Sequence, residues 1–331
     1  MKKPPLPLAP TDPYDERPTR REALIRISSA ALAAAAVGGG TLALIDRRPA
    51  MAAAPGIRDW RRTLGAEVPP AVVARGADPV ANVRRALAAL GGMERFVGKG
   101  ESVLLKPNVG WDRLPEQAAN TDPQVMAELV RLCLAAGAGR VVVADISCND
   151  PARCFARSGV RAAAEAAGAE VLDARKLDLV AANLAGAAAG LEVIAPLLAA
   201  DRVINVPVAK HHGLSRVTVG MKNWFGVLGR GRNRLHQDID RSIAELGATF
   251  RPTLTVVDAT RVLLASGPQG GSLDDVKAVG AVLAGIDPVL CDAWGARELG
   301  VDPRTLGFLR EAERRGLGRS DLALVRELGK A

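Results

Sequence analysis

Lysine is scarce beyond residue 54, where arginine is strongly preferred, yet Lys106, Lys210 and Lys222 all stand close to an asparagine or a histidine. A lysine retained against such a bias can serve as a compact point charge or as an amine with a tunable pKa. Together with Asn108 and Asn223, the three ammonium groups would form a positive pocket suited to a carboxylate or a phosphate. Chance retention of these lysines is the alternative interpretation.

The chain has three histidines, His211, His212 and His236, which lie close together in the sequence. Imidazole titrates near neutral pH without special tuning, so this concentration indicates general acid–base chemistry or metal binding. Adjacent side chains point in different directions from an extended segment, so we expect at most one of His211 and His212 in a shared site. His236 is placed at a predicted helix start, where a surface histidine is an equally good interpretation.

Acidic residues offer a second possible chemistry. Asp145 and Asp258 end apolar runs and could hold a metal ion together with water. Asp122 and Asp287 each precede a proline, so N-capping of a helix is the better interpretation for both. The chain lacks a G-x-S-x-G motif, a complete P-loop and a G-x-G-x-x-G motif after a strand, which argues against a serine hydrolase and the common nucleotide sites.

The four cysteines, Cys133, Cys148, Cys154 and Cys291, include no C-x-x-C pair. This spacing argues against a ferredoxin-type iron-sulfur cluster and against a zinc ribbon. Cys133 and Cys291 lie in apolar helical patterns and are expected in the core. Cys148 and Cys154 flank a polar loop, where they could form a disulfide in an oxidising compartment or remain free thiols.

The elements that must position these residues alternate between strand and helix patterns, which predicts an α/β fold with a mostly parallel or mixed sheet covered by helices on both faces. A glycine-rich loop follows over 267–275 and could act as a mobile lid. Because ligands bind at the carboxyl edge of such sheets, polar residues after the strands are expected to converge there. The predicted strands are 102–109, 140–146, 170–174, 202–208, 254–258 and 276–286, and the predicted helices are 77–97, 123–137, 152–167, part of 213–228, 236–246, 287–299 and 303–315.

Composition agrees with one large globular domain rather than a disordered chain. The 331 residues are 48% hydrophobic and only 3% aromatic, so the core must consist mainly of aliphatic side chains. The net charge of +8 comes from scattered arginines. Nucleic-acid proteins more often concentrate basic residues with aromatics, so the short basic run 230–234 is interpreted as solvated surface or an anion contact, and no nucleic-acid partner is predicted.

The N-terminal segment has the order of an export signal. Arg20 and Arg21 precede a mildly apolar run over 27–45, and residues 52–54 offer a small-residue cleavage site. We predict a twin-arginine signal peptide over 1–54, a lead-in with a helix over 55–100 and the α/β domain over 101–331. The chain would then engage the twin-arginine translocation machinery and become periplasmic or extracellular. An uncleaved leader acting as a membrane anchor is the alternative, because the apolar run is just long enough to span a bilayer.

Motifs in a fixed order give a resemblance to a known family. They are Lys106-Pro107-Asn108, Thr121-Asp122-Pro123, Asn205 to Gly213, Met221 to Gly226, Asp258 and Asp287-Pro288-Val289 with Asp292. In this order they resemble the domain of unknown function 362 family from about residue 100 to 318. The resemblance implies that His212 matches the family's histidine, whereas Val208 and His211 stand where lysine and threonine are common. Some members carry ferredoxin-type iron-sulfur segments, for which this chain lacks the cysteines.

The leading hypothesis is an exported α/β protein that binds or transforms a small anionic compound. His212, Lys210 and Lys222 are the predicted catalytic residues, and ligand contacts are predicted for Lys106, Asn108, Asn223 and His211. Asp145 and Asp258 would orient this apparatus or hold a metal. Apart from His211, all of these residues are expected to converge on one cleft. The alternative is a non-catalytic periplasmic binding, maturation or redox-accessory protein.

Overall fold

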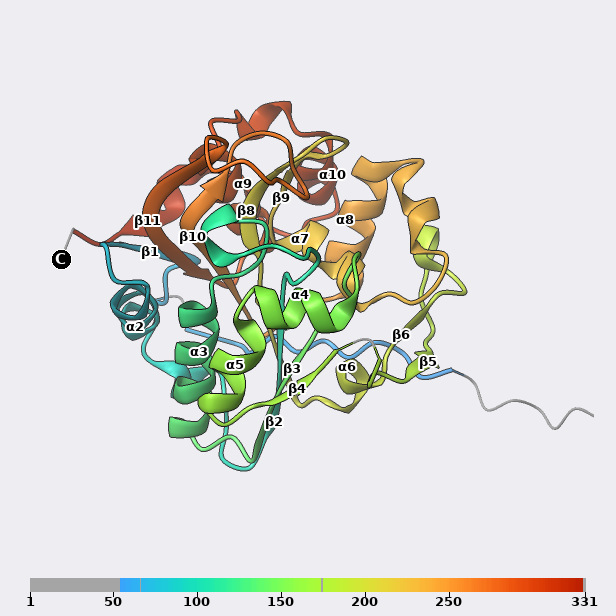
Figure 1. Ribbon diagram of the computed structural model, residues 1–331, viewed down its shortest axis with the longest axis horizontal. Helices are drawn as coiled ribbons and strands as arrows, with labels where there is room; N and C mark the ends of the chain where they lie inside the picture. The colour runs from blue at the N-terminus through green and yellow to red at the C-terminus, as the bar shows by residue number, and fades with distance from the viewer. Residues whose placement is uncertain (1–53, 66, 174, 330–331) are drawn as a thin grey trace, which may run out of the picture. The chain divides into compact units, whose positions relative to one another are not determined.

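A computed structural model describes residues 54–65, 67–173 and 175–329, in which strands and helices alternate (Figure 1). The predicted signal peptide lies outside the described residues except for Ala54. Among the described residues, no helix is both long and apolar enough to cross a membrane.

A ten-stranded sheet forms the centre of the fold, with the strand order β12-β1-β11-β10-β7-β2-β3-β4 and with β8 paired to β10 and β9. The pairs that β2 forms with β3 and β7 are parallel, whereas β11 runs antiparallel to both β1 and β10. The sheet is therefore mixed, and the predicted α/β fold is confirmed. Its strands are β1 (Ala71–Arg75), β2 (Ser102–Pro107), β3 (Arg140–Ala144), β4 (Glu170–Leu172), β7 (Arg202–Val206), β8 (Val208–His212), β9 (Arg216–Thr218), β10 (Leu254–Leu263), β11 (Val276–Gly285) and β12 (Val325–Glu327). A separate two-stranded sheet pairs β5 (Leu179–Ala181) with β6 (Glu192–Ile194).

Helices pack on both faces of the large sheet. The α-helices are α2 (Pro79–Ala89), α3 (Pro123–Ala135), α4 (Pro151–Arg157), α5 (Val160–Ala166), α6 (Ala195–Ala199), α7 (Gly220–Asn223), α8 (Ile239–Thr249), α9 (Pro288–Glu298) and α10 (Gly307–Arg314). Short 3-10 turns cover Met93–Arg95, Pro115–Gln117, Gly186–Ala188, Trp224–Val227, Arg232–His236, Pro303–Thr305 and Leu322–Leu324.

Two hydrophobic cores follow from the alternation of side chains along the strands. On β2, Val103 and Leu105 belong to one core, together with residues of α2, α3 and α5, whereas Leu104 belongs to the other. The second core contains residues of α6 to α10 and the aromatic side chains of Trp224 and Trp294. Because β1, β2, β3, β7, β10 and β11 each contribute to both cores, the central part of the sheet is buried on its two faces, as its runs of Val, Leu and Ile require.

The strands around Pro207 differ from the prediction. The single strand predicted over 202–208 is split into β7 and β8, so Lys210 and His211 lie within a strand rather than after one. Proline has no N–H to donate, and here its carbonyl accepts from Asp258 N at 2.8 Å. The strand predicted to end at Asp258 instead continues to Leu263, which places Asp258 in its middle.

Two of the predicted helices are interrupted in the structure at glycines with positive φ. The helix predicted over 77–97 ends as α2 at Ala89, because Gly91 and Gly92 have φ of 96° and 88°. The helix predicted over 152–167 is divided into α4 and α5 at Gly159, with φ of 74°. Within 213–228 the strand β9 precedes two short helical segments, α7 and the turn Trp224–Val227, and the helix predicted from His236 begins at Ile239.

The two predicted helix caps are confirmed. Asp122 and Asp287 are N-caps, accepting from Gln124 N and from Val289 N at 2.8 Å each.

All four cysteines of the chain are described, and each is a free thiol. Cys133 and Cys291 are buried as predicted, whereas the possible disulfide is not formed, because Cys154 is buried and Cys148 is exposed.

Candidate functional site

A pocket of about 910 Å³ lies at the carboxyl edge of β2 and β3. It collects most of the residues singled out from the sequence, although they come from strands, turns and loops far apart in the chain. The predicted residues that line it are Lys106, Asn108, Asp145, Lys210, His212, Lys222 and Asn223. His211 and Asp258 are not among its lining residues.

Another hollow, of about 810 Å³, lies between α8 and α10. Apart from Gly307, its wall consists of charged side chains, several of which form ion pairs with one another or with Glu245, as Arg315 and Arg314 do with Glu311. These charges neutralise each other locally. We therefore assign the candidate site to the pocket at the sheet edge.

Lys106 and Asp145 form a buried ion pair on the pocket floor, with 2.8 Å between Nζ and Oδ1. Lys106 Nζ also donates to the carbonyl of Pro107 at 2.7 Å and to Asn223 Oδ1 at 2.9 Å. Burial lowers the pKa of Lys106, and the Asp145 carboxylate opposes this effect. Because its hydrogen bonds are all used within the protein, Lys106 positions its neighbours rather than offering a free charge.

Asn223 connects this ion pair to the rest of the site. Its Oδ1 accepts from Lys106 and, at 3.0 Å, from Asn108 Nδ2, while its Nδ2 donates to Asn205 Oδ1 at 2.8 Å. Asn108 Oδ1 in turn accepts from Lys210 Nζ at 2.9 Å. The asparagines therefore form one network that fixes the lysines of β2 and β8 relative to each other.

Lys210 is fully buried and has neutral partners. Its Nζ donates to Asn108 Oδ1 and to the carbonyl of Ala119, the latter at 2.5 Å. Burial lowers the pKa of Lys210 to about 7, whereas the Asp145 carboxylate acts in the opposite direction. An ammonium group held by neutral acceptors adds positive potential to the pocket.

Lys222 differs from the other two lysines. Its side chain is only 7% exposed, and its Nζ lies 3.7 Å from the ring centroid of Phe225. Within the described part of the chain, no acceptor forms a hydrogen bond or ion pair with this ammonium group. Burial lowers the pKa of Lys222 to about 7. The cation–π contact offsets part of the desolvation cost, and the remaining donor capacity is open to a ligand.

His212 is held as a neutral imidazole. Its Nδ1 accepts from Leu214 N at 3.1 Å and from Ser215 N at 3.3 Å, within the hairpin turn that joins β8 and β9. An Nδ1 atom that accepts leaves the proton on Nε2. Burial, reinforced by the charges of Lys222 and Lys210, lowers the pKa of His212 to about 3. At neutral pH His212 is therefore a hydrogen-bond donor and is poorly suited to the proton exchange predicted for it.

His236 has the opposite tautomer. Its Nδ1 lies 3.2 Å from the carbonyl of Asn233, which can only accept, so the proton is on Nδ1 and Nε2 keeps a lone pair. The ring stacks on His212 with a centroid distance of 6.3 Å and meets Phe225 edge-on at 5.1 Å. From the sequence, a surface position was an equally good interpretation of His236. In the structure, His236 lines the pocket.

The structure places His211 and Asp258 outside the pocket lining, so Asp258 does not join the predicted cleft. The ligand contact predicted for His211 stays a prediction. His211 Nδ1 accepts from Gly267 N at 3.1 Å, so it ties β8 to the loop before β11. Asp258 accepts from Asp122 N at 2.7 Å and from Thr260, which fixes the start of α3. Asp145 lines the pocket, whereas Asp258 does not. Among the described residues, no group of three or more His, Cys, Asp or Glu side chains is arranged to hold a metal ion.

Other lining residues were missed or given another role by the sequence patterns. Arg230 and Arg232 stand in the basic run that was interpreted as surface or an anion contact, and both line the pocket. Arg232 donates to the carbonyls of Phe225 and Ile146 at 3.0 and 3.2 Å, which closes the loop over the site. Trp111 and Cys148 also line it, but a lone tryptophan or cysteine carries no positional signal in a sequence.

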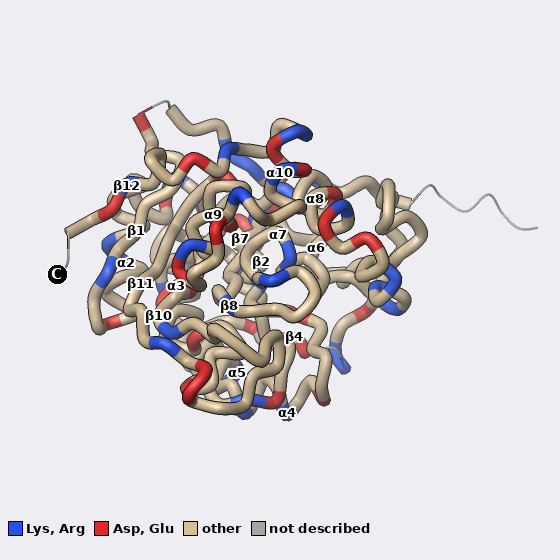
Figure 2. The backbone as a smooth tube through the Cα atoms, turned by 90° about the horizontal axis from the view of Figure 1, so that it is seen from above, with Lys and Arg blue, Asp and Glu red and all other residues tan. Residues whose placement is uncertain are grey.

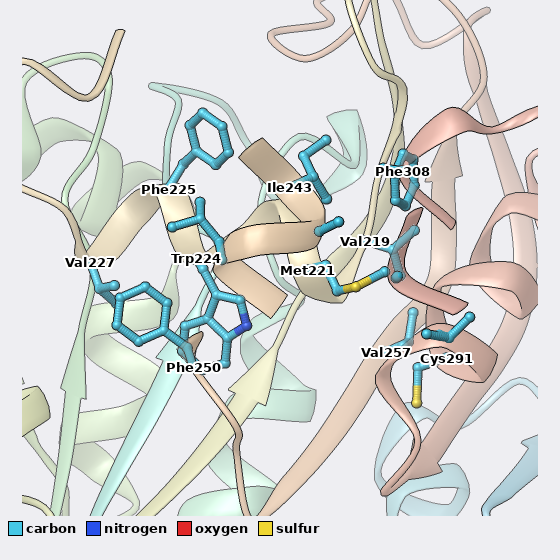
Figure 3. Packing of buried hydrophobic residues seen from close by; sticks show 14 of the residues in the cluster. Val219, Met221, Trp224, Phe225, Val227, Ile243, Phe250, Val257, Cys291 and Phe308 are labelled. Atoms are coloured by element: carbon cyan, nitrogen blue, oxygen red, sulfur yellow. The ribbon is translucent and has the colours of Figure 1, made fainter. Parts of the chain in front are cut away.

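The segment that carries Lys222 and Asn223 is fixed from two sides. Asp292 of α9 accepts from Gly220 N at 2.7 Å, at the start of α7. Figure 3 shows Trp224 beside Phe250 in the core while Phe225 points away from them, and Phe225 lines the pocket. At position 226 a Cβ atom would lie 1.9 Å from Asp145 Oδ1, so the segment can approach the ion pair only because this residue is glycine.

Charged residues of both signs are interspersed along the chain in the view of Figure 2. The lining of the pocket, in contrast, has more basic than acidic residues. Its lining includes Lys210, Lys222, Arg230 and Arg232 against a single acid, Asp178, besides the paired Lys106 and Asp145. The excess of positive charge is thus a local feature of the site.

Comparison with known proteins gives a family for this fold and site. The chain is 29% identical over 251 residues to a thylakoid-associated protein from Synechocystis sp., covering 72% of this chain and 75% of that protein. A crystal structure of a Thermotoga maritima protein matches with a TM-score of 0.36 and 12% identity, over 72% of this chain and 60% of the other. The family model described as Domain of unknown function (DUF362) matches residues 103–297, which contain β2 to α9 and the ordered motifs. The chain therefore belongs to the domain of unknown function 362 family.

Proposed function

We propose that the pocket binds a small compound with a negatively charged group and that Lys222 is the main contact of that group. The observation that carries this proposal is the largely buried side chain of Lys222, whose ammonium forms no hydrogen bond or ion pair with the described residues and faces the pocket. Burying a charge is costly unless it is paired, so an anionic ligand would supply the missing partner. Lys210, Arg230 and Arg232 add attraction at longer range.

The rest of the ligand would be at least partly apolar. Trp111, Ile146, Leu177, Phe225 and Leu228 line the same pocket, so an anion carried on an aromatic or aliphatic body fits better than a fully polar one. His212 would donate its Nε2 hydrogen to the ligand. For a reaction that moves a proton near neutral pH, Lys222 is the better carrier because its pKa is about 7, whereas that of His212 is about 3.

Benzoate and sulfate are suitable probes, because neither changes charge between pH 6 and 9, and calorimetric titration measures their binding. Replacing Lys222 by Met should weaken both anions by roughly 10- to 100-fold, as expected for the loss of about 1.5–3 kcal/mol from a hydrogen bond to a charged group. Lys99→Met is the matched control, since Lys99 is exposed and precedes β2 at the opposite edge of the sheet. Absence of saturable binding, or equal affinities in both variants, would overturn the proposal.

The alternative of a non-catalytic binding, maturation or redox-accessory role shares this pocket. Native mass spectrometry and metal analysis of the protein purified from its own host separate the two. A stoichiometric compound recovered unchanged after incubation supports carriage, whereas its conversion supports catalysis. A stoichiometric metal would instead favour the maturation role.

We also propose that the chain is exported through the twin-arginine pathway and acts outside the cytoplasm. The support is Arg20-Arg21 followed by the apolar run and the small residues 52–54. The relative from Synechocystis is described as thylakoid-associated, which fits a site of action next to a membrane.

A further inference from the structure

An exposed thiol forms part of the pocket wall. Cys148 follows β3, and its backbone N–H donates to the Gly110 carbonyl at 2.8 Å. Asn149 N donates to the same carbonyl at 3.2 Å, so the backbone around the thiol is fixed. The other three cysteines of the chain are buried. In the folded protein, a reagent of moderate size therefore meets Cys148 first.

The thiol shares its surroundings with the unpaired ammonium of Lys222. Cys148, Lys210 and Lys222 all line the pocket, and burial lowers the pKa of both lysines to about 7. A Cβ atom at Gly110 would lie 3.9 Å from Cys148 Sγ and 3.8 Å from Asn108 Oδ1, which accepts from Lys210 Nζ, so the sulfur lies in the same part of the pocket as this amine. Reactive cysteines characteristically occur in such electropositive, partly exposed surroundings, whereas structural cysteines are buried.

A disulfide is excluded as the role of this thiol in the fold. Cys154 lies in the core formed by α3, α4 and α5, beside Phe155, and is a free, fully buried thiol. Burial also raises the pKa of Cys154, which keeps it protonated and unreactive. Cys148 is left without a covalent partner while it faces a pocket with excess positive charge.

We propose that Cys148 is a nucleophile of this pocket and that its substrates are anionic compounds bearing an electrophilic carbon, an inference that rests on the proposed anion site. The negative group would lie against Lys222, which places the rest of the compound along the pocket wall. The thiolate sulfur attacks the carbon, and the S–C bond forms as the bond to the leaving group breaks. The leaving group departs with the bonding electron pair, and the proton of the thiol passes to water.

Two alkylating reagents test this directly, because iodoacetate carries a negative charge and iodoacetamide does not. The ratio of their rates at Cys148 does not depend on the fraction of thiolate, which is common to both reactions. Rates would be measured on the full chain by mass spectrometry of the peptide that contains Cys148. Cys148→Ser identifies any reaction at other sites.

The iodoacetate-to-iodoacetamide ratio should be about tenfold higher in the wild type than in Lys222→Met, because loss of a nearby unit charge weakens the attraction of an anion. Lys99→Met should behave as the wild type. In the wild-type protein, excess sulfate should slow iodoacetate more than iodoacetamide, a test that needs no folded variant. Equal ratios in wild type and Lys222→Met, with no selective effect of sulfate, would overturn the proposal.

The outcome can be separated from that of the anion site itself. Benzoate and sulfate carry no leaving group, so their binding to the wild type measures the anion site without the chemistry of the thiol. Normal anion binding combined with an iodoacetate advantage that is absent would reject the nucleophile and leave the anion site in place. Loss of anion binding in the wild type would reject both.

Discussion

At the scale of single residues, the three pocket lysines differ in how their charge is compensated. Lys106 has a carboxylate and Lys210 has neutral oxygen atoms, whereas Lys222 has the face of Phe225. Lys106 thus forms a structural ion pair, whereas Lys222 keeps free hydrogen-bond donors. Of the three, only Lys222 is arranged to gain a charged partner when a ligand binds.

The stability of the ligand-free protein should depend on pH through the titration of Lys222. Its pKa is about 7 when folded and near its ordinary value of 10.5 when unfolded, so the unfolded chain binds more protons between these pH values. Titration of Lys222 therefore lowers the free energy of unfolding as the pH falls from about 10.5 to about 7, because the folded state disfavours the charged form. Lys222→Met should therefore be more stable than the wild type at pH 7, with the difference vanishing near pH 10.5.

Urea unfolding at a series of pH values measures this difference. The comparison of wild type with Lys222→Met cancels the other titrating groups, and Lys99→Met, an exposed lysine, should show no such trend. A difference that is constant with pH would mean that Lys222 keeps its ordinary pKa in the folded protein.

Residue types and order were enough to predict Lys106 and Asn108 at the carboxyl edge of the sheet, because parallel strands end on one side. Lys210 and Lys222 reach the same pocket from within β8 and from α7, which the strand pattern did not predict. Residue types and order also could not predict the role of His212. That role depends on two backbone N–H groups of a hairpin turn, and nothing in the side-chain pattern specifies which imidazole nitrogen they contact.

At the scale of elements, the short helix α7 controls the site, although four residues are too few for a stable isolated helix. It is held by the buried carboxylate of Asp292, which accepts from both Gly220 N and Met221 N. Lys222 and Asn223 follow immediately. The last aspartate of the D-P-V-x-x-D motif therefore has a positioning role.

Asp292→Asn should lower the free energy of unfolding by about 1–3 kcal/mol, because the amide nitrogen in place of Oδ2 cannot accept from Met221 N, which then keeps only its 3.3 Å contact with Oδ1. Benzoate affinity should fall as well, since Lys222 is displaced with α7. Chemical denaturation and calorimetry measure the two effects. Asp302→Asn is the matched control: Asp302 is an exposed cap, and asparagine caps about as well as aspartate. Unchanged affinity in Asp292→Asn would show that α7 holds its place without this contact.

The periodic strands and helices were largely predictable, since their hydrophobic patterns are local. The extent of β10 was not, because Asp258 interrupts its apolar run like a strand end. The carboxylate is tolerated in the sheet because Asp122 N and Thr260 donate to it from the start of α3 and from its own strand. Such long-range partners are invisible in a local pattern.

At the scale of the whole molecule, the described residues from Ala54 onward form one compact unit. All of the described residues that line the pocket lie between Lys106 and Pro268 of this unit. Export and ligand binding should therefore be separable properties of the chain.

Replacement of Arg20 and Arg21 by lysine should leave the precursor in the cytoplasm, because the pathway's receptor recognises the arginine pair. Fractionation followed by immunoblotting measures the distribution. The accumulated precursor should still bind benzoate. Unchanged export of the double variant would reject the twin-arginine assignment, and a membrane-bound form that keeps its leader would support the anchor instead.

The placement of the tryptophans gives the molecule an intrinsic optical reporter. Of its four tryptophans, Trp60, Trp224 and Trp294 are essentially inaccessible, whereas Trp111 is half-buried and lines the pocket. The emission of an indole shifts with the polarity around it, so a bound anion should alter the fluorescence of Trp111 and leave that of the other three unchanged. Trp111→Phe should abolish the spectral change on adding benzoate, and its persistence would place the ligand elsewhere.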